Sequence, residues 1–265
     1  MAAAQLRLGP ARRIQRLIRS EQPAVMLCAD VGLQVGPLPR YPDIDALGDL
    51  IALPFDAIFL TVAGLRWHAN VFLHRPELGL VVRTDWCSQW RPAHHFPHAD
   101  GRAVTITTPA EAADSGADAI AQYLLLGSGD PDVERGYIKR TAKCVRAAHA
   151  IGLPVIVEPL IRGGAVSGQE RRADLMRLAI RTACELGADA LKIEFPEEED
   201  AADVIAASSV PTLMASTPPL GDCQAIARAQ LGRAARADGV AYSADFFGSE
   251  RPEELLAALR LALTE

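Results

Sequence analysis

The sequence contains one lysine at a position where a charged side chain is unexpected. Only three lysines occur in 265 residues, Lys139, Lys143 and Lys192, and the remaining positive charge is carried by arginine. Lys139 and Lys143 lie in a segment with helical spacing, whereas Lys192 interrupts the apolar run of GADALKIEFPEEED (187–200). That run follows a glycine-containing turn and ends at a proline, as a buried strand does. Lys192 is therefore the first candidate for chemistry.

Side-chain alternation along this strand predicts which way the lysine points. Leu191, Ile193 and Phe195 share one side, which suits packing against helices, and Lys192 and Glu194 share the other. The same alternation in PVIVEPL (154–160) and AVMLCAD (24–30) directs Glu158 and Asp30 to that inner side. Three strand ends are thus expected to deliver Lys192, Glu158 and Asp30 to one place.

These three side chains suit carbonyl chemistry. Burial among apolar groups is expected to lower the pKa of Lys192, and a neutral amine can attack a carbonyl group to form a Schiff base. Glu158 and Asp30 would then transfer protons. The alternative is a structural ion pair, in which Lys192 merely neutralises Glu158 or Glu194 inside the protein.

The elements that position these residues follow a regular pattern. Helical segments at 132–151 and 170–187 alternate with apolar runs that are introduced by Gly, Pro or an Asp-containing junction. The eight candidate strands lie within 23–30, 54–62, 78–85, 115–126, 152–160, 186–195, 210–216 and 236–244. Such alternation is typical of parallel strands joined by helical crossovers.

Eight units in this length predict an α/β fold of the (β/α)8 TIM-barrel type, which takes roughly 250 residues. We expect residues 1–265 to form this single domain, with an amphipathic N-terminal helix capping it. A doubly wound open sheet is the alternative, but ADVGLQVGP (29–37) lacks the spacing of a dinucleotide-binding turn. The rhythm is interrupted at 85–116 by a long polar loop with a short strand-like piece, a candidate substrate wall.

Composition excludes several classes of protein. A net charge of −6 and dispersed arginines disfavour a nucleic-acid partner, and no run approaches the roughly 20 apolar residues of a membrane span. Five scattered cysteines without a CxxC pair indicate neither a disulfide framework nor a structural zinc site. We expect a cytoplasmic protein that assembles as a homo-oligomer.

The motifs LKIEFP (191–196), VEPLIRGG (157–164) and MLCADVG (26–32) resemble the class I, Schiff-base aldolases of the DeoC/LacD family. This family includes tagatose-bisphosphate, sulfofructose-phosphate and archaeal-type fructose-bisphosphate aldolases. The resemblance extends from about residue 23 to the end of the chain. It implies that Lys192 forms the imine, at the end of the sixth strand of a barrel.

The resemblance also assigns other residues. Asp30 matches the first-strand aspartate that contacts substrate hydroxyls or transfers protons, and Glu158 matches the fifth-strand glutamate of the tagatose-type branch. Arg162 stands where the fructose-type branch has an arginine. That branch has a proton-donating tyrosine where this chain has Leu160, so Glu158 would have to do its work.

The sequence differs from the family in the two segments that bind the phosphate groups of sugar phosphates. MASTPPLGD (214–222) lacks the glycine pair after the seventh strand, and AYSADFFGS (241–249) lacks the arginine after the eighth. Ser216, Thr217 and Ser243 offer neutral hydrogen-bond donors instead. We therefore expect a small carbonyl substrate, with or without a phosphate group, bound by Arg162, Glu194 and these hydroxyls.

We expect neither a cofactor nor a metal ion. His94, His95 and His98 are contiguous in the 85–116 loop and are interpreted as solvated polar surface. The predicted function is carbon–carbon bond cleavage or formation through a lysine Schiff base on a ketose or sugar-phosphate-like substrate. The alternatives are a biosynthetic aldol-type condensation on the same scaffold and a barrel that binds a metabolite without turnover.

Overall fold

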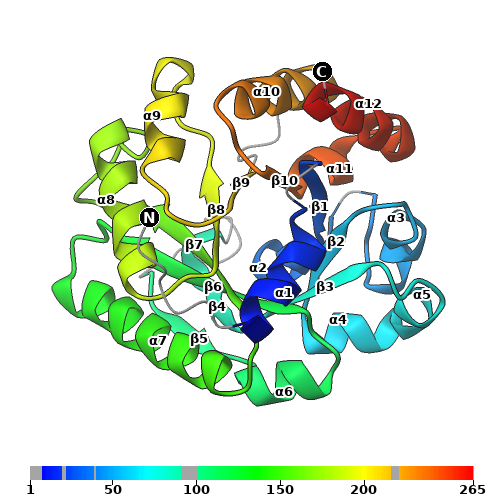
Figure 1. The fold of residues 1–265 in the computed structure, drawn as a ribbon, viewed down its shortest axis with the longest axis horizontal. Helices are drawn as coiled ribbons and strands as arrows, with labels where there is room; N and C mark the ends of the chain where they lie inside the picture. The colour runs from blue at the N-terminus through cyan, green and yellow to red at the C-terminus, as the bar shows by residue number, and fades with distance from the viewer. Residues whose placement is uncertain (1–7, 20–21, 39, 91–100, 216–220, 265) are drawn as a thin grey trace.

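The computed structural model describes residues 8–19, 22–38, 40–90, 101–215 and 221–264. Eight parallel strands close into a barrel in the order β1, β10, β9, β8, β7, β6, β3 and β2 (Figure 1). These strands are β1 Ala24–Cys28, β2 Ala57–Leu60, β3 Gly79–Arg83, β6 Ala119–Leu126, β7 Val155–Ile161, β8 Ala190–Glu194, β9 Thr212–Ala215 and β10 Gly239–Tyr242. Each lies within one of the eight apolar runs, apart from the last residue of β7, so the predicted TIM barrel is confirmed.

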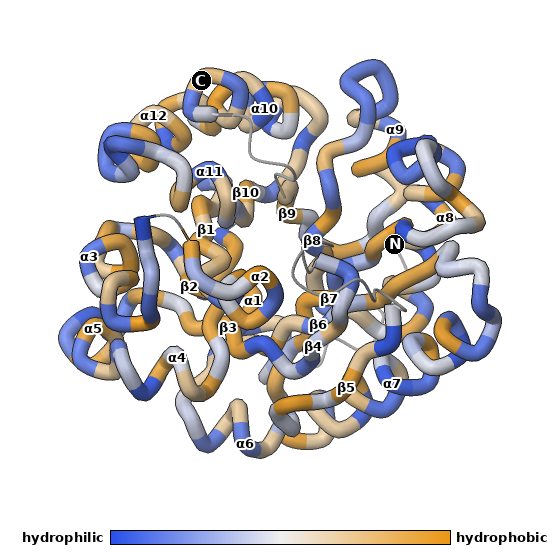
Figure 2. Tube along the Cα trace, turned by 180° about the vertical axis from the view of Figure 1, so that it is seen from behind, coloured by the Kyte–Doolittle hydropathy of each residue, from blue (hydrophilic) through white to orange (hydrophobic). Residues whose placement is uncertain are grey.

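The helices ring the barrel on the outside (Figure 1). The longest is α7, Pro131–Ala150, whose first turn is capped by Asp130: its Oδ1 accepts a hydrogen bond from the backbone nitrogen of Asp132 at 2.8 Å. Hydrophobic and hydrophilic residues alternate along the outer helices, as expected for helices with one face on the barrel (Figure 2). The other helices of eight or more residues are α1 Leu8–Leu17, α8 Ala173–Glu185, α10 Asp222–Ala234 and α12 Pro252–Thr264.

Alternation along the strands separates two apolar clusters. Inside the barrel lie small side chains such as Ala57 and Ala190 and larger ones such as Phe59 and Ile156. The opposite faces, including Leu191, pack against the helices. This is the inward and outward assignment that the sequence pattern predicts for β7 and β8.

Helix α1 caps the barrel at the end where the strands begin. Leu17 is 1% exposed and packs against Gly79, where an added Cβ would lie 2.3 Å from the Leu17 Cδ2 atom. Arg13 donates a hydrogen bond to the carbonyl oxygen of Ala117 at 3.0 Å, which fixes the helix to the loop before β6. The predicted N-terminal capping helix is confirmed, and it leaves the opposite end of the barrel for the site.

The segment 85–116, which was expected to hold one short strand-like piece, contains two short strands. β4 Asp85–Cys87 pairs antiparallel with β5 Ala103–Thr105, and α6 Pro109–Asp114 follows. The predicted histidine cluster lies in 91–100, outside the described residues. The buried Tyr137 hydroxyl donates a hydrogen bond to the carbonyl oxygen of Gly101 at 2.7 Å, so this hairpin is tied to α7.

Short helical segments follow the first two strands. After β1 come η1 Ala29–Val31 and α2 Gly32–Val35, and then η2 Asp45–Leu47 and α3 Gly48–Ile51. After β2 come α4 Val62–Trp67 and α5 Ala69–His74. Among the described helices, none is long and apolar enough to cross a membrane.

Candidate active site

The three predicted catalytic side chains meet at the end of the barrel where the strands finish. Lys192 on β8 and Glu158 on β7 form an ion pair with 2.8 Å between Nζ and Oε2. Asp30, in the turn after β1, joins them through a shared partner described below. All three line one cavity of about 250 Å³, together with Glu194 and Ser243.

Arg83 is the residue that connects the two carboxylates. It lies at the end of β3 with no exposed surface, and its Nε donates to Asp30 Oδ2 at 2.6 Å. Its Nη2 donates to Glu158, and its guanidinium carbon stands 4.1 Å from the centre of the Tyr123 ring. Lys192 and Arg83 thus hold Glu158 from two sides, one through each carboxylate oxygen.

Sequence reasoning missed Arg83, although the position of this arginine on its strand decides which way it faces. Val81 belongs to the interior cluster, so a residue two positions later on the same strand also faces inward. A register fixed by Val81 would have directed Arg83 to the mouth. This arginine completes a buried group of three cations and three carboxylates with the members Lys192, Arg83, Arg140, Asp30, Glu158 and Asp85.

The protonation of Lys192 differs from the sequence-based expectation. Burial acts against its ammonium form, but the Cys28 sulfur and the carboxylates of Glu158 and Asp30 act in the opposite direction and outweigh it, so the pKa of Lys192 is raised above its ordinary value. The expectation of a lowered pKa was wrong because it considered the burial of Lys192 and left out the charges of the carboxylates predicted to lie beside it. In the resting site Lys192 is an ammonium group.

Two neighbours of Lys192 are fixed in opposite protonation states. Burial raises the pKa of the Cys28 thiol to about 12, so it is neutral beside the ammonium group. For Asp30 burial acts in the raising direction, but Arg83 and Lys192 outweigh it, and the pKa of Asp30 is lowered. Asp30 is therefore a permanent carboxylate that can accept hydrogen bonds.

The predicted substrate-binding residues are only partly brought together. Glu194 lines the cavity and accepts a hydrogen bond from Arg162, whose guanidinium carbon lies 5.2 Å from the centre of the Trp90 ring. Burial raises the pKa of Glu194, and Arg162 acts against that shift. Ser243 lines the cavity, whereas Ser216 and Thr217 lie outside the described residues.

Gln34 on α2 is a further polar residue of the cavity that sequence reasoning missed. It is 4% exposed, and neither its amide nitrogen nor its amide oxygen has a hydrogen-bond partner among the described residues. A buried amide without partners costs free energy, which a bound substrate would recover by supplying a donor and an acceptor. Gln34 was missed because the turn after β1 shows no periodicity.

Among the described residues, no cluster of His, Cys, Asp and Glu could hold a metal ion.

Similarity to known protein families agrees with the geometry of this site. Residues 51–247 match the model of the family described as DeoC/LacD family aldolase. The chain belongs to the DeoC/LacD family of aldolases. This is the class I, Schiff-base family that the motifs resemble, and the predicted family and the predicted aldolase class are confirmed.

Individual proteins also match nearly the whole chain. An aldolase described as uncharacterized, from Saccharolobus solfataricus, is 26% identical over 91% of this chain and 90% of its own length. A 2-amino-3,7-dideoxy-D-threo-hept-6-ulosonate synthase of Archaeoglobus fulgidus is 26% identical over 96% of this chain and 90% of its own length. An archaeal fructose-1,6-bisphosphate aldolase, solved with its catalytic lysine bound to a carbinolamine intermediate, has a TM-score of 0.82 at 21% identity and covers 97% of this chain and 100% of its own.

Removal of the Arg83 charge should destabilise the fold of this aldolase. Arg83→Met leaves Asp30 and Glu158 buried without their shared cation, and we expect a loss of about 3–5 kcal/mol in the free energy of unfolding. Urea unfolding measures the loss. Arg135→Met, which removes a 72% exposed arginine from an i,i+3 pair, should cost at most about 1 kcal/mol. Equal losses in the two variants would contradict the central role of Arg83.

Proposed function

We propose that this protein is an aldolase in which Lys192 forms an imine with a ketone and Glu158 carries the protons of the reaction. The observation that carries the proposal is the Lys192–Glu158 pair, with 2.8 Å between Nζ and Oε2, in a cavity at the barrel mouth. A nucleophile within hydrogen-bond distance of a base is the arrangement that covalent catalysis requires.

Each step uses a group that the cavity already holds. Glu158 takes a proton from the Lys192 ammonium group, and the resulting amine attacks the ketone carbon. The protonated Glu158 returns its proton to the carbinolamine hydroxyl, which leaves as water and gives the imine. In cleavage, the Glu158 carboxylate removes the proton of the substrate hydroxyl while the carbon–carbon bond breaks; an aldehyde departs and an enamine remains. Protonation and addition of water release the ketone.

The other cavity residues bind and orient the substrate in this proposal. Asp30, held as a carboxylate by Arg83, accepts hydrogen bonds from substrate hydroxyls. Gln34 and Ser243 supply further donors and acceptors, and Glu194 positions Arg162 at the rim. Ser216 and Thr217 are still proposed, on the basis of the sequence, to donate hydrogen bonds to the substrate. A substrate that carries several hydroxyl groups, such as a ketose, suits this set.

A second candidate is a biosynthetic condensation on the same residues. The similarity to the Archaeoglobus fulgidus synthase over 96% of the chain favours it. Both candidates need the Lys192 imine, and they differ in the aldehyde or acceptor that the enamine meets. The metabolite-binding alternative is disfavoured by the intact pair of Lys192 and Glu158.

Borohydride trapping tests the imine directly. With dihydroxyacetone as the probe, reduction should fix an adduct on the peptide that contains Lys192, identified by mass spectrometry after digestion. Lys192→Arg keeps the charge but cannot form the imine and should show no adduct. An adduct confined to Lys139 or Lys143 on α7 would refute the proposal.

The site is expected to discriminate weakly against an unphosphorylated ketone. Among the described residues that line the cavity, Lys192 is the one cation, and Arg162 is already paired with Glu194. Charge-assisted hydrogen bonds to phosphate are about twice as strong as neutral ones. Neutral hydroxyl donors in this cavity would therefore add little to the binding of a phosphate group. We expect kcat/KM for dihydroxyacetone phosphate to exceed that for dihydroxyacetone by less than about tenfold, under roughly 1.4 kcal/mol. A preference of several hundredfold would show that another cation holds the phosphate.

A further inference from the structure

We propose that a second cavity, separated from the catalytic one by the α2 turn, binds the acceptor aldehyde of the aldol reaction, and that this aldehyde carries an uncharged, mainly apolar substituent. The inference rests on the proposed function, because it names the partner that the Lys192 enamine would meet. The second cavity measures about 380 Å³, within the usual range for small-molecule sites.

The α2 turn forms the partition between the two cavities. Val31, Gln34 and Val35 line the catalytic cavity, whereas Gly32 and Leu33 line the second. Asp30, directly before the turn, lines both. An aldehyde that extends past Asp30 can therefore place its carbonyl group beside Lys192 and Glu158 in the catalytic cavity while its substituent remains in the second.

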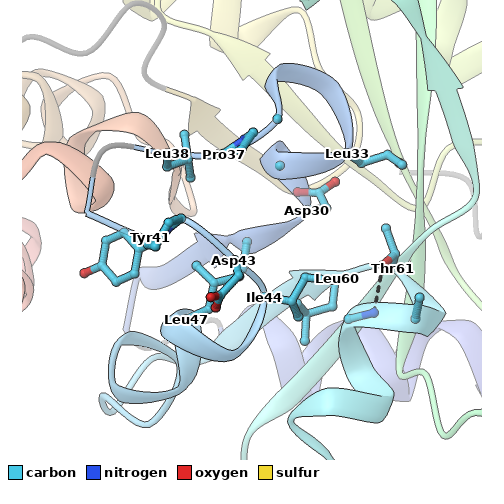
Figure 3. Close-up of a pocket in the computed structure, with 16 residues that line it drawn as sticks. Asp30, Leu33, Pro37, Leu38, Tyr41, Asp43, Ile44, Leu47, Leu60 and Thr61 are labelled. Carbon is cyan, nitrogen blue, oxygen red and sulfur yellow. Dashed lines mark hydrogen bonds between the residues drawn. The ribbon is translucent and has the colours of Figure 1, made fainter.

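The lining of the second cavity is apolar on opposite sides. Figure 3 shows Leu33, Pro37 and Leu38 on one side of the cavity and Ile44, Leu47 and Leu60 on the other, with Asp30 between them at one end. Large apolar side chains on both sides favour an alkyl or aryl group, because the burial of its surface is the main source of binding free energy.

The charges of the second cavity exclude an anionic substituent. Asp30 and Asp43 are both acidic, and no lysine, arginine or histidine is among the described residues that line the cavity. A phosphate or carboxylate placed here would meet like charges in a partly desolvated space. The acceptor of this protein should therefore differ from a phosphorylated triose.

The polar side chains at the rim are already engaged with the backbone. Asp43 Oδ1 accepts from the backbone nitrogen of Ala46 at 2.9 Å, and Thr61 Oγ1 accepts from that of Gly64 at 2.9 Å. These bonds shape the surrounding turns and leave apolar contact as the main interaction on offer.

The wall of the second cavity is held in place by contacts behind it. His68, which is 5% exposed, makes a hydrogen bond between its Nε2 atom and the carbonyl oxygen of Ile44 at 2.8 Å. The Tyr41 ring packs edge-on against Phe247, with 5.5 Å between ring centres. A wall fixed in this way reduces the entropic cost of ligand binding.

The reaction balances with an aldehyde in this place. The donor ketone condenses with Lys192 and loses water to give the protonated imine, and the Glu158 carboxylate then takes one α-proton, which gives the enamine. The enamine carbon forms a bond to the aldehyde carbon, and the aldehyde oxygen takes a proton from the protonated Glu158. Addition of water to the resulting protonated imine then releases a β-hydroxyketone and returns Lys192 to its ammonium form, beside the Glu158 carboxylate.

The test compares two acceptors with hydroxyacetone as the donor. For the wild-type protein we expect kcat/KM for pentanal to exceed that for glyceraldehyde 3-phosphate at least about tenfold. Ile44 is 40% exposed, so Ile44→Arg adds a cation to the cavity with little cost to the core. It should lower kcat/KM for pentanal at least about tenfold and raise it for the phosphorylated aldehyde.

Two controls separate the second cavity from the imine. Ile151→Arg changes a 47% exposed isoleucine directly after α7, at the opposite end of the barrel, and should leave both acceptors unaffected. Borohydride trapping of hydroxyacetone on Lys192 should be unchanged in Ile44→Arg. Leu33→Arg serves as a second variant of the cavity, and thermal unfolding checks that each variant is folded.

The outcomes distinguish the two proposals. If borohydride trapping is normal and kcat/KM for pentanal is the same in wild-type protein and in both cavity variants, the proposed acceptor site is wrong. The proposed function is not affected by that result. Absence of trapping in the wild type would overturn the proposed function. Calorimetric binding of pentanamide, which cannot react, then tests the cavity independently: loss of binding in Ile44→Arg supports an apolar ligand site, and absence of binding to wild-type protein overturns it.

Discussion

The site depends on the burial of compensating charges at the mouth of the barrel. Arg83 has no exposed surface, and it shares Glu158 with Lys192. Each ion alone would cost several kcal/mol to bury, so the group is stable only when all its members are present. This mutual dependence fixes the position of Glu158 and also the charge of Lys192. The same interactions that fold the mouth of the barrel therefore prepare the nucleophile and its base.

An ammonium group is not a nucleophile, so the raised pKa of Lys192 needs a local solution. Glu158 provides it, because a proton can pass over 2.8 Å within the pair without any exchange with solvent. The state with a neutral amine and a protonated carboxyl group contains as many protons as the resting ion pair. It is a minor state that forms inside the cavity, and substrate can capture it at neutral pH. Arg83 and Asp30 remain charged throughout and hold the geometry.

Much of this architecture follows from patterns that a single sequence contains. The eight apolar runs and the helical spacing between them predict a barrel because buried parallel strands require helices on their outer side. Alternation, together with their places along their strands, brings Lys192 and Glu158 to one end of the barrel, and Asp30 joins them from the turn after β1. The direction of the Lys192 pKa shift was nevertheless predicted wrongly, because the expectation considered burial alone and alternation does not say how strongly neighbouring charges oppose it.

Other features depend on contacts without a periodic signal. Arg83 required a register for β3, which Val81 could have fixed, whereas Gln34 lies in a short turn whose side-chain directions are set only by packing. The apolar cavity beyond that turn is assembled from three separate segments, 29–38, 41–47 and 60–64. None of these segments resembles a binding motif by itself, because the site arises from their positions in space.

The pH dependence of imine formation tests the central claim, that Glu158 accepts the proton of Lys192 within the pair. Single-turnover trapping of dihydroxyacetone by borohydride gives the rate, for wild-type protein and for Glu158→Gln. If the proton moves inside the pair, the wild-type rate is flat between about pH 7 and 9, and Glu158→Gln is slower by roughly 10²–10⁴-fold and gains about tenfold per pH unit. A wild-type rate that itself rises about tenfold per pH unit, with Glu158→Gln close to normal, would contradict the account.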